Sequence, residues 1–344
     1  MRLSAMLAYA NDPQTTLNKA IEWERAGVDI LWVAEAYGFD APTLMGYLAA
    51  RTERVEIGSA ILPIYSRTPT LLAQTAAGLD AVSGGRAILG IGASGPQVIE
   101  GWHGVPYDRP LRRTREVVEI CRRVWRREVI THEGSYRLPL PPDQGTGLGK
   151  ALKILTHPVR DRIPIYIAAL GEQNVRLTAE IADGWLPILF IPERAGDVWG
   201  DALAAGKAKR DPALGPLEIV AGGPLAIGEG LEPYRDLARP SMALYVGGMG
   251  ARGRNFYNDL AKRYGYAAEA ELVQDLYLSG KKEEAAAAIP AEFVELTSLI
   301  GTPDFVRGRV EALAAAGVTV LNVNPVGPEP AKDLAAVKQM LGSG

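Results

Sequence analysis

Short, nearly continuous apolar runs recur along the chain, and most are followed by a segment with helical periodicity. Runs of this kind are typical of parallel strands that helices cover on both faces. Helices are predicted at 13–26, 42–52, 68–82, 111–125 and 171–182, and Thr302 is placed to cap another. The apolar runs predict eight strands, at 3–9, 28–34, 55–62, 87–91, 163–169, 185–190, 217–226 and 318–324.

Two distant segments repeat one pattern, RAGVDILWVAE at 25–35 and AAGVTVLNVNP at 315–325. Each reads as a helix end, a glycine and a buried strand, which is the joint of a repeating βα unit. About eight units fit the chain, so we predict a single (β/α)8 TIM barrel over 1–344, an α/β fold. An excursion at 126–162 precedes the fifth strand, and a helical insertion at 228–300 follows the seventh. An open doubly wound sheet would place G-x-G-x-x-G after its first strand, where Ala10-Asn11-Asp12 stands.

The third predicted strand, VEIGSAIL, contains the small residues Gly58 and Ser59. Small residues inside an apolar strand indicate a bulge, or a backbone that a flat group approaches closely. An ordinary strand with a glycine kink is the alternative. Thr68 and Pro69 then begin the next helix as its N-cap and first residue.

Composition narrows the class of protein. Of 344 residues, 47% are hydrophobic and 22% charged, and the net charge is -3, which argues against nucleic acid as a partner. Cys121 shares a helical face with apolar residues and is expected in the core, and the three histidines are too scattered to suggest a metal site. We expect a soluble, cytoplasmic protein with no membrane partner, because the N-terminus reads as a strand and no apolar run has membrane-spanning length.

The loops that follow barrel strands form the functional face of such a fold. Glu35 is the carboxylate clearly at a strand end, and it is either a catalytic group or a solvated loop acid. No Ser-His-Asp or Cys-His set can be assembled. At the same face the sequence also places Ala60 with Ile61, Gly92, Ala93 and Ser94, the Gly171-Glu172-Gln173-Asn174 turn, Trp185 and Asn324.

Gly171-Glu172-Gln173-Asn174 follows a buried strand and begins a helix. Free N–H groups and the helix dipole at such a point suit a phosphate, although glycine can serve there for the turn alone. The small Gly92-Ala93-Ser94 stretch is either a tight turn or room for a cofactor.

Three runs carry a resemblance: RAILGIGASGPQVIEGWHGVPY at 86–107, AALGEQNVRLTAEIADGW at 168–185 and GSAILP at 58–63. They resemble the luciferase-like oxidoreductases, and within these the branch that uses the deazaflavin coenzyme F420, typified by methylene-tetrahydromethanopterin reductase. The likeness covers roughly 1–225 and resumes at 302–325. It implies a (β/α)8 barrel, in agreement with the strand pattern.

The resemblance also implies roles for single residues. A cis peptide at Ala60–Ile61 would back the deazaflavin ring, Gly92 to Ser94 would lie beside the ring, and Gly171 with Glu172 would form the phosphate turn. Glu35 stands where the family usually has Asp followed by His, but Ala36 follows here, so no proton donor is implied at position 36. Gly95-Pro96 stands near the place where some relatives carry a catalytic Glu, which argues against dehydrogenation of a sugar phosphate.

We therefore expect an F420-dependent oxidoreductase that moves a hydride to or from a small organic substrate. The alternatives are an FMN-dependent monooxygenase of the same superfamily, and a non-redox barrel that binds a phosphorylated ligand. The non-redox barrel would usually need a lysine or paired acids at strand ends, and neither is found. We expect a homodimer, and a substrate pocket roofed by the insertion, including 245–254, with Tyr65 and Trp102. Each of these pocket residues has core or interface packing as its alternative.

Overall fold

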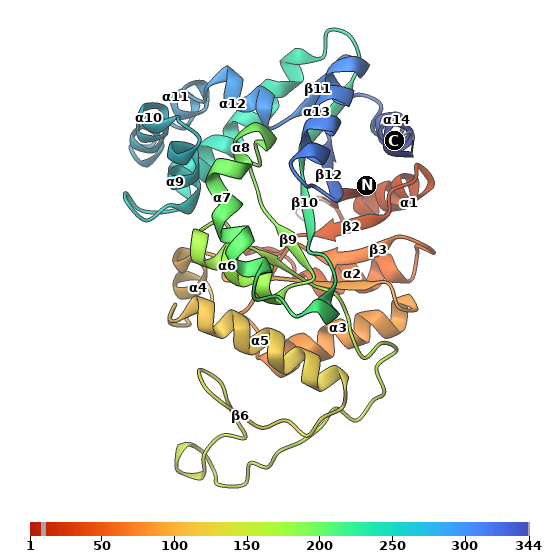
Figure 1. Cartoon of the computed structure of the whole chain (residues 1–344), viewed down its shortest axis with the longest axis vertical. Coiled ribbons are helices and arrows are strands. Elements are labelled where there is room, and N and C mark those ends of the chain that lie inside the picture. Colours follow the sequence, from red (N-terminus) through yellow and green to blue (C-terminus); the bar gives the residue numbers. More distant parts are fainter. Residues whose placement is uncertain (8–11, 343–344) are drawn as a thin grey trace.

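The computed structural model describes residues 1–7 and 12–342, in which eight parallel strands close into a barrel (Figure 1). Closure is complete because β1 pairs with both β2 and β12, while β10 pairs with both β12 and β9. The predicted (β/α)8 barrel is confirmed. Its strands are β1 (Arg2–Leu7), β2 (Ile30–Val33), β3 (Glu56–Ser59) continued by β4 (Leu62–Pro63), β5 (Ala87–Gly92), β8 (Ile165–Ala168), β9 (Gly184–Leu186), β10 (Glu218–Ile227) and β12 (Val320–Pro325).

The sixth barrel strand is shorter than its predicted range, 185–190, for a local reason. The sixth barrel strand, predicted to reach residue 190, ends at Leu186 because Pro187 cannot donate to the ladder and Leu189 is left-handed, with φ 54°. The first strand is described over Arg2–Leu7, and its predicted last residues, 8 and 9, lie outside the described residues.

Helices cover the outside of the barrel (Figure 1). The predicted N-caps are confirmed, since the Thr68 hydroxyl accepts from the Leu71 N–H at 3.2 Å and the Thr302 hydroxyl from the Phe305 N–H at 3.3 Å. The predicted helices are α1 (Pro13–Arg25), α2 (Ala41–Ala49), α3 (Pro69–Ser83), α5 (Pro110–Trp125), α6 (Glu172–Ile181) and α13 (Pro303–Ala315), and the structure adds α4 (Pro96–Gly101), α7 (Pro192–Lys207) and α14 (Pro330–Gly342).

Two large aromatic side chains fill the barrel interior. The rings of Trp32 and Tyr166 lie 5.5 Å apart between centroids, and each covers a glycine of the next strand. A Cβ atom at Gly58 would overlap the Trp32 indole, and one at Gly184 would overlap the Tyr166 ring. The flat group that approaches Gly58 is therefore the protein's own tryptophan, which explains why a glycine is needed there.

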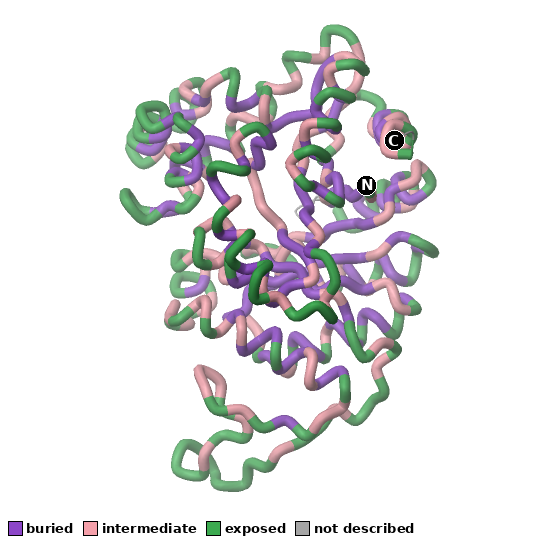
Figure 2. The backbone as a smooth tube through the Cα atoms, viewed as in Figure 1, coloured by how far each residue is buried: buried purple, intermediate pink, exposed green. Residues whose placement is uncertain are grey.

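The predicted core position of Cys121 is confirmed. Cys121 is fully buried on α5, as expected for a core residue, and burial raises the pKa of its thiol to about 12. Figure 2 shows the buried residues concentrated on the barrel and on the inner faces of its helices.

In the part of the chain described here, no helix is long and apolar enough to cross a membrane. No three His, Cys, Asp or Glu side chains among residues 1–7 and 12–342 could hold a metal ion.

The predicted excursion contains an antiparallel hairpin, β6 (His132–Glu133) with β7 (Arg137–Leu138), and a short helix, η1 (Pro142–Gln144). The Glu116 carboxylate of α5 holds the hairpin by accepting from the N–H groups of Ser135 at 3.0 Å and Tyr136 at 3.1 Å. At the far end of the excursion, Arg160 Nε donates to the buried Asp80 carboxylate at 3.0 Å. The excursion is thus tied to the barrel near both of its ends.

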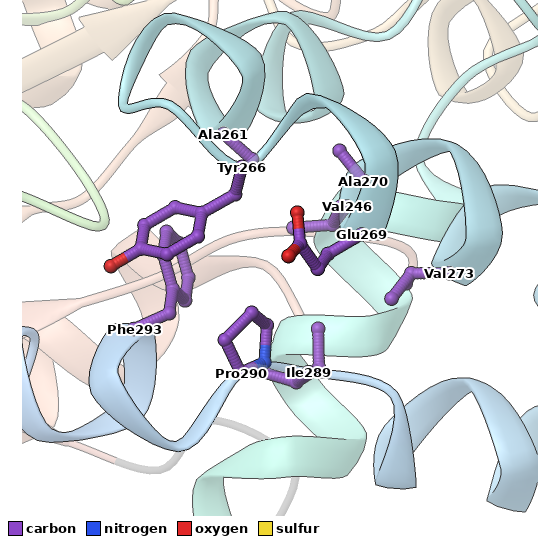
Figure 3. Close-up of a pocket in the computed structure, with 9 residues that line it drawn as sticks. All are labelled: Val246, Ala261, Tyr266, Glu269, Ala270, Val273, Ile289, Pro290 and Phe293. Carbon is purple, nitrogen blue, oxygen red and sulfur yellow. The ribbon is translucent and has the colours of Figure 1, made fainter.

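The predicted insertion is helical, but it closes on a strand that was not predicted, β11 (Leu299–Gly301), which pairs with the end of β10. Its core includes a cavity of about 10 Å³ lined mainly by apolar side chains such as Val246 and Phe293 (Figure 3). That volume is about what one water molecule needs, so the cavity is a packing gap. The helices are η3 (Glu232–Ala238), α8 (Arg239–Ala243), the π-helical turn η4 (Leu244–Gly248), α9 (Phe256–Arg263), α10 (Ala267–Leu278), α11 (Lys282–Ala287) and α12 (Ala291–Leu296).

Candidate active site

The third barrel strand has a bulge at the carboxyl end of the barrel. Gly58 pairs with Ile88 and Leu62 pairs with Ile91, so the segment between these pairs has one residue more than its partner strand. The bulge and the cis peptide bond at Ala60–Ile61 were both predicted, and both are confirmed.

The Ser59 side chain replaces the ladder bonds that the bulge interrupts. Its hydroxyl donates to the Gly90 carbonyl at 2.8 Å and accepts from the Gly90 N–H at 2.9 Å. Position 90 must be glycine because a Cβ atom there would overlap the Ser59 carbonyl oxygen. Ser59 and Gly90 together therefore determine the shape of this wall.

The bulge brings together residues from three neighbouring strand ends. A Cβ atom on Gly92 of β5 would lie 2.8 Å from Ile61 Cδ1 and 3.5 Å from the Ala168 Cβ atom of β8. Ala60, Ile61 and Ala168 are half-buried, so this wall is apolar and partly open. The structure thus brings the predicted Ala60–Ile61 and Gly92 positions side by side.

The apolar wall continues around the mouth of the barrel. Met6, Ala60 and Leu186 pack on the interior cluster that contains Trp32 and Tyr166, yet all three remain partly exposed. A polar pair joins the neighbouring strands β1 and β12, where the buried Ser4 hydroxyl donates to Asn322 Oδ1 at 3.1 Å. The mouth therefore has an apolar floor that could contact a planar ring.

Glu35 follows β2 and is fully engaged by protein groups. Arg67 binds both carboxylate oxygens, with Nη1 2.5 Å from Oε1 and Nη2 2.8 Å from Oε2, and the Ala41 N–H donates to Oε2 at 2.8 Å. The exposed side-chain fractions are 7% for Glu35 and 13% for Arg67, so the pair is shielded from water. Glu35 is therefore an ordered ion-pair partner rather than a solvated loop acid.

Arg67 was not singled out from the sequence. It is a strand-end arginine one loop away from a strand-end glutamate, and adjacent βα loops meet at one face of a barrel. The opposite charges on these two neighbouring loops were therefore the sequence signal that could have revealed Arg67 as a partner of Glu35. The inward-facing Asn322 could have been found from the period of two along its strand.

The Gly92-Ala93-Ser94 stretch leads from the last residue of β5 toward the start of α4. Ser94 adopts φ 58°, which is uncommon for a residue other than glycine. Its carbonyl accepts from the Tyr107 hydroxyl at 3.3 Å, and Tyr107 stacks on Tyr65 with ring centroids 5.1 Å apart. Ala93 and Ser94 are half-buried at the mouth, beside the wall formed by Ile61 and Gly92.

The N-terminus of α6 has no side-chain cap. Gly171 is the N-cap in extended backbone, and the Asn174 N–H bonds back to its carbonyl at 3.0 Å. Of the first three helical N–H groups, those of Glu172 and Gln173 thus have no protein partner in the part of the chain described here. Such donors at the positive end of a helix suit an anion.

Two buried tryptophans hold the turn before α6 from behind. The Trp185 indole N–H donates to the Ala169 carbonyl, and that of Trp199 donates to the Leu170 carbonyl, both at 2.9 Å. On the open side, Phe256 of the insertion lies 3.7 Å from where a Cβ atom on Gly171 would be. The turn is thus held by hydrogen bonds on one side, and the insertion reaches it on the other.

The other residues expected at the pocket separate into two groups. Tyr65 is buried, and its hydroxyl donates to the Asp108 carbonyl at 2.7 Å, so its packing alternative is confirmed. Trp102 is 64% exposed and lies beside the exposed Tyr37, with ring centroids 6.3 Å apart, so core packing does not account for it. Its role in a substrate pocket stays a prediction.

The sequence profile of the luciferase-like monooxygenase family matches residues 1–320. The chain belongs to this family. It is 43% identical to a protein of Mycobacterium tuberculosis named "Putative coenzyme F420-dependent oxidoreductase", over 98% of this chain and 99% of that one.

Two further similar proteins are named as reductases. The 5,10-methylenetetrahydromethanopterin reductase of Archaeoglobus fulgidus is 28% identical over 90% of each chain. The solved structure of the coenzyme F420-dependent tetrahydromethanopterin reductase of Methanopyrus kandleri superimposes with a TM-score of 0.81, at 23% identity, over 98% of this chain and 97% of that one. The resemblance stated from the sequence is confirmed at the level of family and fold.

Proposed function

We propose that this member of the family is an oxidoreductase that binds coenzyme F420 at the barrel mouth and exchanges a hydride with a small organic substrate. The observation that carries the proposal is the uncapped N-terminus of α6 at the same mouth as the bulged wall of Ile61 and Gly92. A ligand with a planar ring and a phosphate matches both features. The relative from Mycobacterium tuberculosis, similar over nearly its whole length, bears the name of such an enzyme.

Different residues of the mouth would contact different parts of the cofactor. Ala60, Ile61 and Gly92 would contact one face of the ring, and the N–H groups of Glu172 and Gln173 would hold the phosphate. When bound, the deazaflavin supplies the two-electron hydride exchange. The protein contributes an apolar, shaped site with water excluded from the covered face.

Glu35 and Arg67 form a shielded ion pair at this mouth. Because Arg67 binds both oxygens of Glu35, the carboxylate fixes the guanidinium in one orientation. We propose that Glu35 acts through Arg67, whose remaining N–H donors would orient the substrate. Glu35 is then a positioning residue, which refines its expected catalytic role.

The proposal is tested by titrating the purified protein with coenzyme F420 and, separately, with FMN. We expect quenching of deazaflavin fluorescence that saturates at one cofactor per chain, and weaker binding of FMN. A Gly92→Val variant should lose deazaflavin binding because its side chain would collide with Ile61 and fill the wall. A Gly78→Ala variant is the control, since a Cβ atom at Gly78 meets nothing within 4 Å.

FMN is the competing ligand because the family is described as monooxygenases. FMN also carries a planar ring and a phosphate, so the wall and the α6 turn would accept it. Tight binding of FMN with no measurable binding of coenzyme F420 would overturn the proposal in favour of the monooxygenase. Binding of neither cofactor would exclude both.

A further inference from the structure

A groove runs down the outside of the barrel between α5 and α6, which lie side by side (Figure 1). Its volume is about 320 Å³. It begins at Gln173, which belongs to the uncapped turn of α6, and continues to Glu180, seven residues along the same helix. At 1.5 Å per residue the α6 side of the groove is about 10 Å long. The groove is therefore continuous with the predicted phosphate site.

The groove is strongly basic in a protein of net charge -3. Its lining residues are Leu111, Arg112, Arg115, Gln173, Arg176, Leu177, Glu180 and Lys209, with four cations against one carboxylate.

Two of these cations already have partners, and two do not. Arg112 pairs with Glu116, and Arg115 pairs with Glu180. The exposed side chains of Arg176 and Lys209 form no hydrogen bond or ion pair within the described ranges 1–7 and 12–342. Unpaired cations concentrated in one groove favour an anionic occupant.

We propose that this groove binds a chain of carboxylates that continues from the phosphate at the N-terminus of α6. In coenzyme F420 the phosphate is followed by a chain of glutamate units, so the occupant is the acidic tail of the cofactor. This inference rests on the proposed function. The groove is long enough for the start of such a chain, and Arg176 lies less than one helical turn beyond Gln173.

The test compares two forms of the cofactor, one with glutamate units and one that ends before them. Each is titrated by fluorescence into the wild-type protein and into the Arg176→Ala/Lys209→Ala double variant. The matched control is Lys19→Ala/Arg307→Ala, which removes two exposed cations elsewhere that make no ion pair in the described structure. Both variants lose the same charge.

We expect the wild type to bind the tailed form about three- to tenfold more tightly than the tail-free form at low salt, as expected for two exposed ion pairs. The Arg176→Ala/Lys209→Ala variant should lose this difference and bind the tail-free form as the wild type does. Salt should weaken binding of the tailed form more steeply in the wild type than in this variant.

The other outcomes separate the two proposals. Equal affinity of the wild type for both forms, or an equal loss in the control variant, overturns the groove assignment and leaves the proposed function intact. If the wild type binds neither form, the proposed function and the groove assignment are both wrong.

Discussion

At the scale of single residues, the shape of the candidate site depends on small side chains that allow close backbone contacts. Ser59 supplies the hydrogen bonds that a bulge would otherwise leave unmade, and Gly90 leaves room for the Ser59 carbonyl. Gly92 leaves room for Ile61, whose side chain faces the mouth. The sequence showed these residues as a cluster of small positions, but it did not show which neighbour each one makes room for.

Replacing Ser59 tests whether its hydroxyl sustains the bulge. In Ser59→Ala the buried Gly90 N–H loses its acceptor, and an unsatisfied buried group costs about 1–3 kcal/mol. We expect the free energy of unfolding, measured with urea, to fall by that amount. The exposed Ser241→Ala serves as control and should change it by less than about 0.5 kcal/mol. A Ser59→Ala protein as stable as the control would show that the hydroxyl is dispensable.

Replacing Glu35 tests its proposed role through Arg67. Glu35→Gln removes a charge-assisted hydrogen bond of the kind worth about 1.5–3 kcal/mol, so kcat should fall about ten- to a hundredfold. Cofactor affinity should stay near the wild-type value because Glu35 is not among the proposed ring or phosphate contacts. Equal rates for Glu35→Gln and wild type across the accessible pH range would make Glu35 a bystander. Partial recovery in Glu35→Asp would support the ion pair as the cause.

At the scale of elements, helix starts were the most predictable features because their capping chemistry is local. Thr68-Pro69 and Thr302-Pro303 each place an acceptor just before a first turn, and both helices begin there. Strand β11 was missed because a three-residue strand carries too little periodicity to recognise. The close approach at Gly58 was predicted without its cause, since its partner Trp32 comes from another strand.

The uncapped start of α6 can be tested by removing one donor. Glu172→Pro eliminates the first helical N–H, while proline is tolerated at that position and Gly171 already has the extended backbone that must precede it. We expect cofactor binding to weaken by about 0.3–2 kcal/mol with the fold intact, measured by titration and circular dichroism. Glu172→Ala, which keeps the donor, should bind at least as well as the wild type. Unchanged affinity in Glu172→Pro would argue against a phosphate at this turn.

The contact between α5 and the hairpin predicts a pH dependence. Burial raises the pKa of Glu116, but the Ser135 and Tyr136 N–H groups, Arg112 and His132 outweigh it and lower this pKa to about 2. A carboxylate with a depressed folded-state pKa stabilises the fold above its unfolded pKa of about 4.5. That stability is lost as the pH falls from about 4.5 toward 2.

The measurement is urea unfolding of wild type and Glu116→Gln between pH 3 and pH 7. We expect wild type to be more stable at pH 7 by about 2 kcal/mol after solvent screening, and the difference to shrink as the pH falls below about 4.5. A constant difference across this range would mean that ionisation of Glu116 does not hold the hairpin.

At the scale of the whole molecule, repetition of the βα unit made the barrel predictable, whereas the site depends on contacts between units. The similar sequence patterns at 25–35 and 315–325 contain strands β2 and β12. Strand β1 pairs with both of them and so closes the barrel. The contact of Phe256 with the α6 turn joins segments about 85 residues apart, and no local pattern encodes it. The homodimer and the cytoplasmic location remain predictions.

The most direct test of the account is a crystal structure of the protein with coenzyme F420 bound. We predict that the ring lies against Ala60, Ile61 and Gly92, and that the phosphate oxygens lie about 3 Å from the backbone nitrogens of Glu172 and Gln173. A ring bound away from the bulge, or a phosphate held anywhere other than the start of α6, would contradict it.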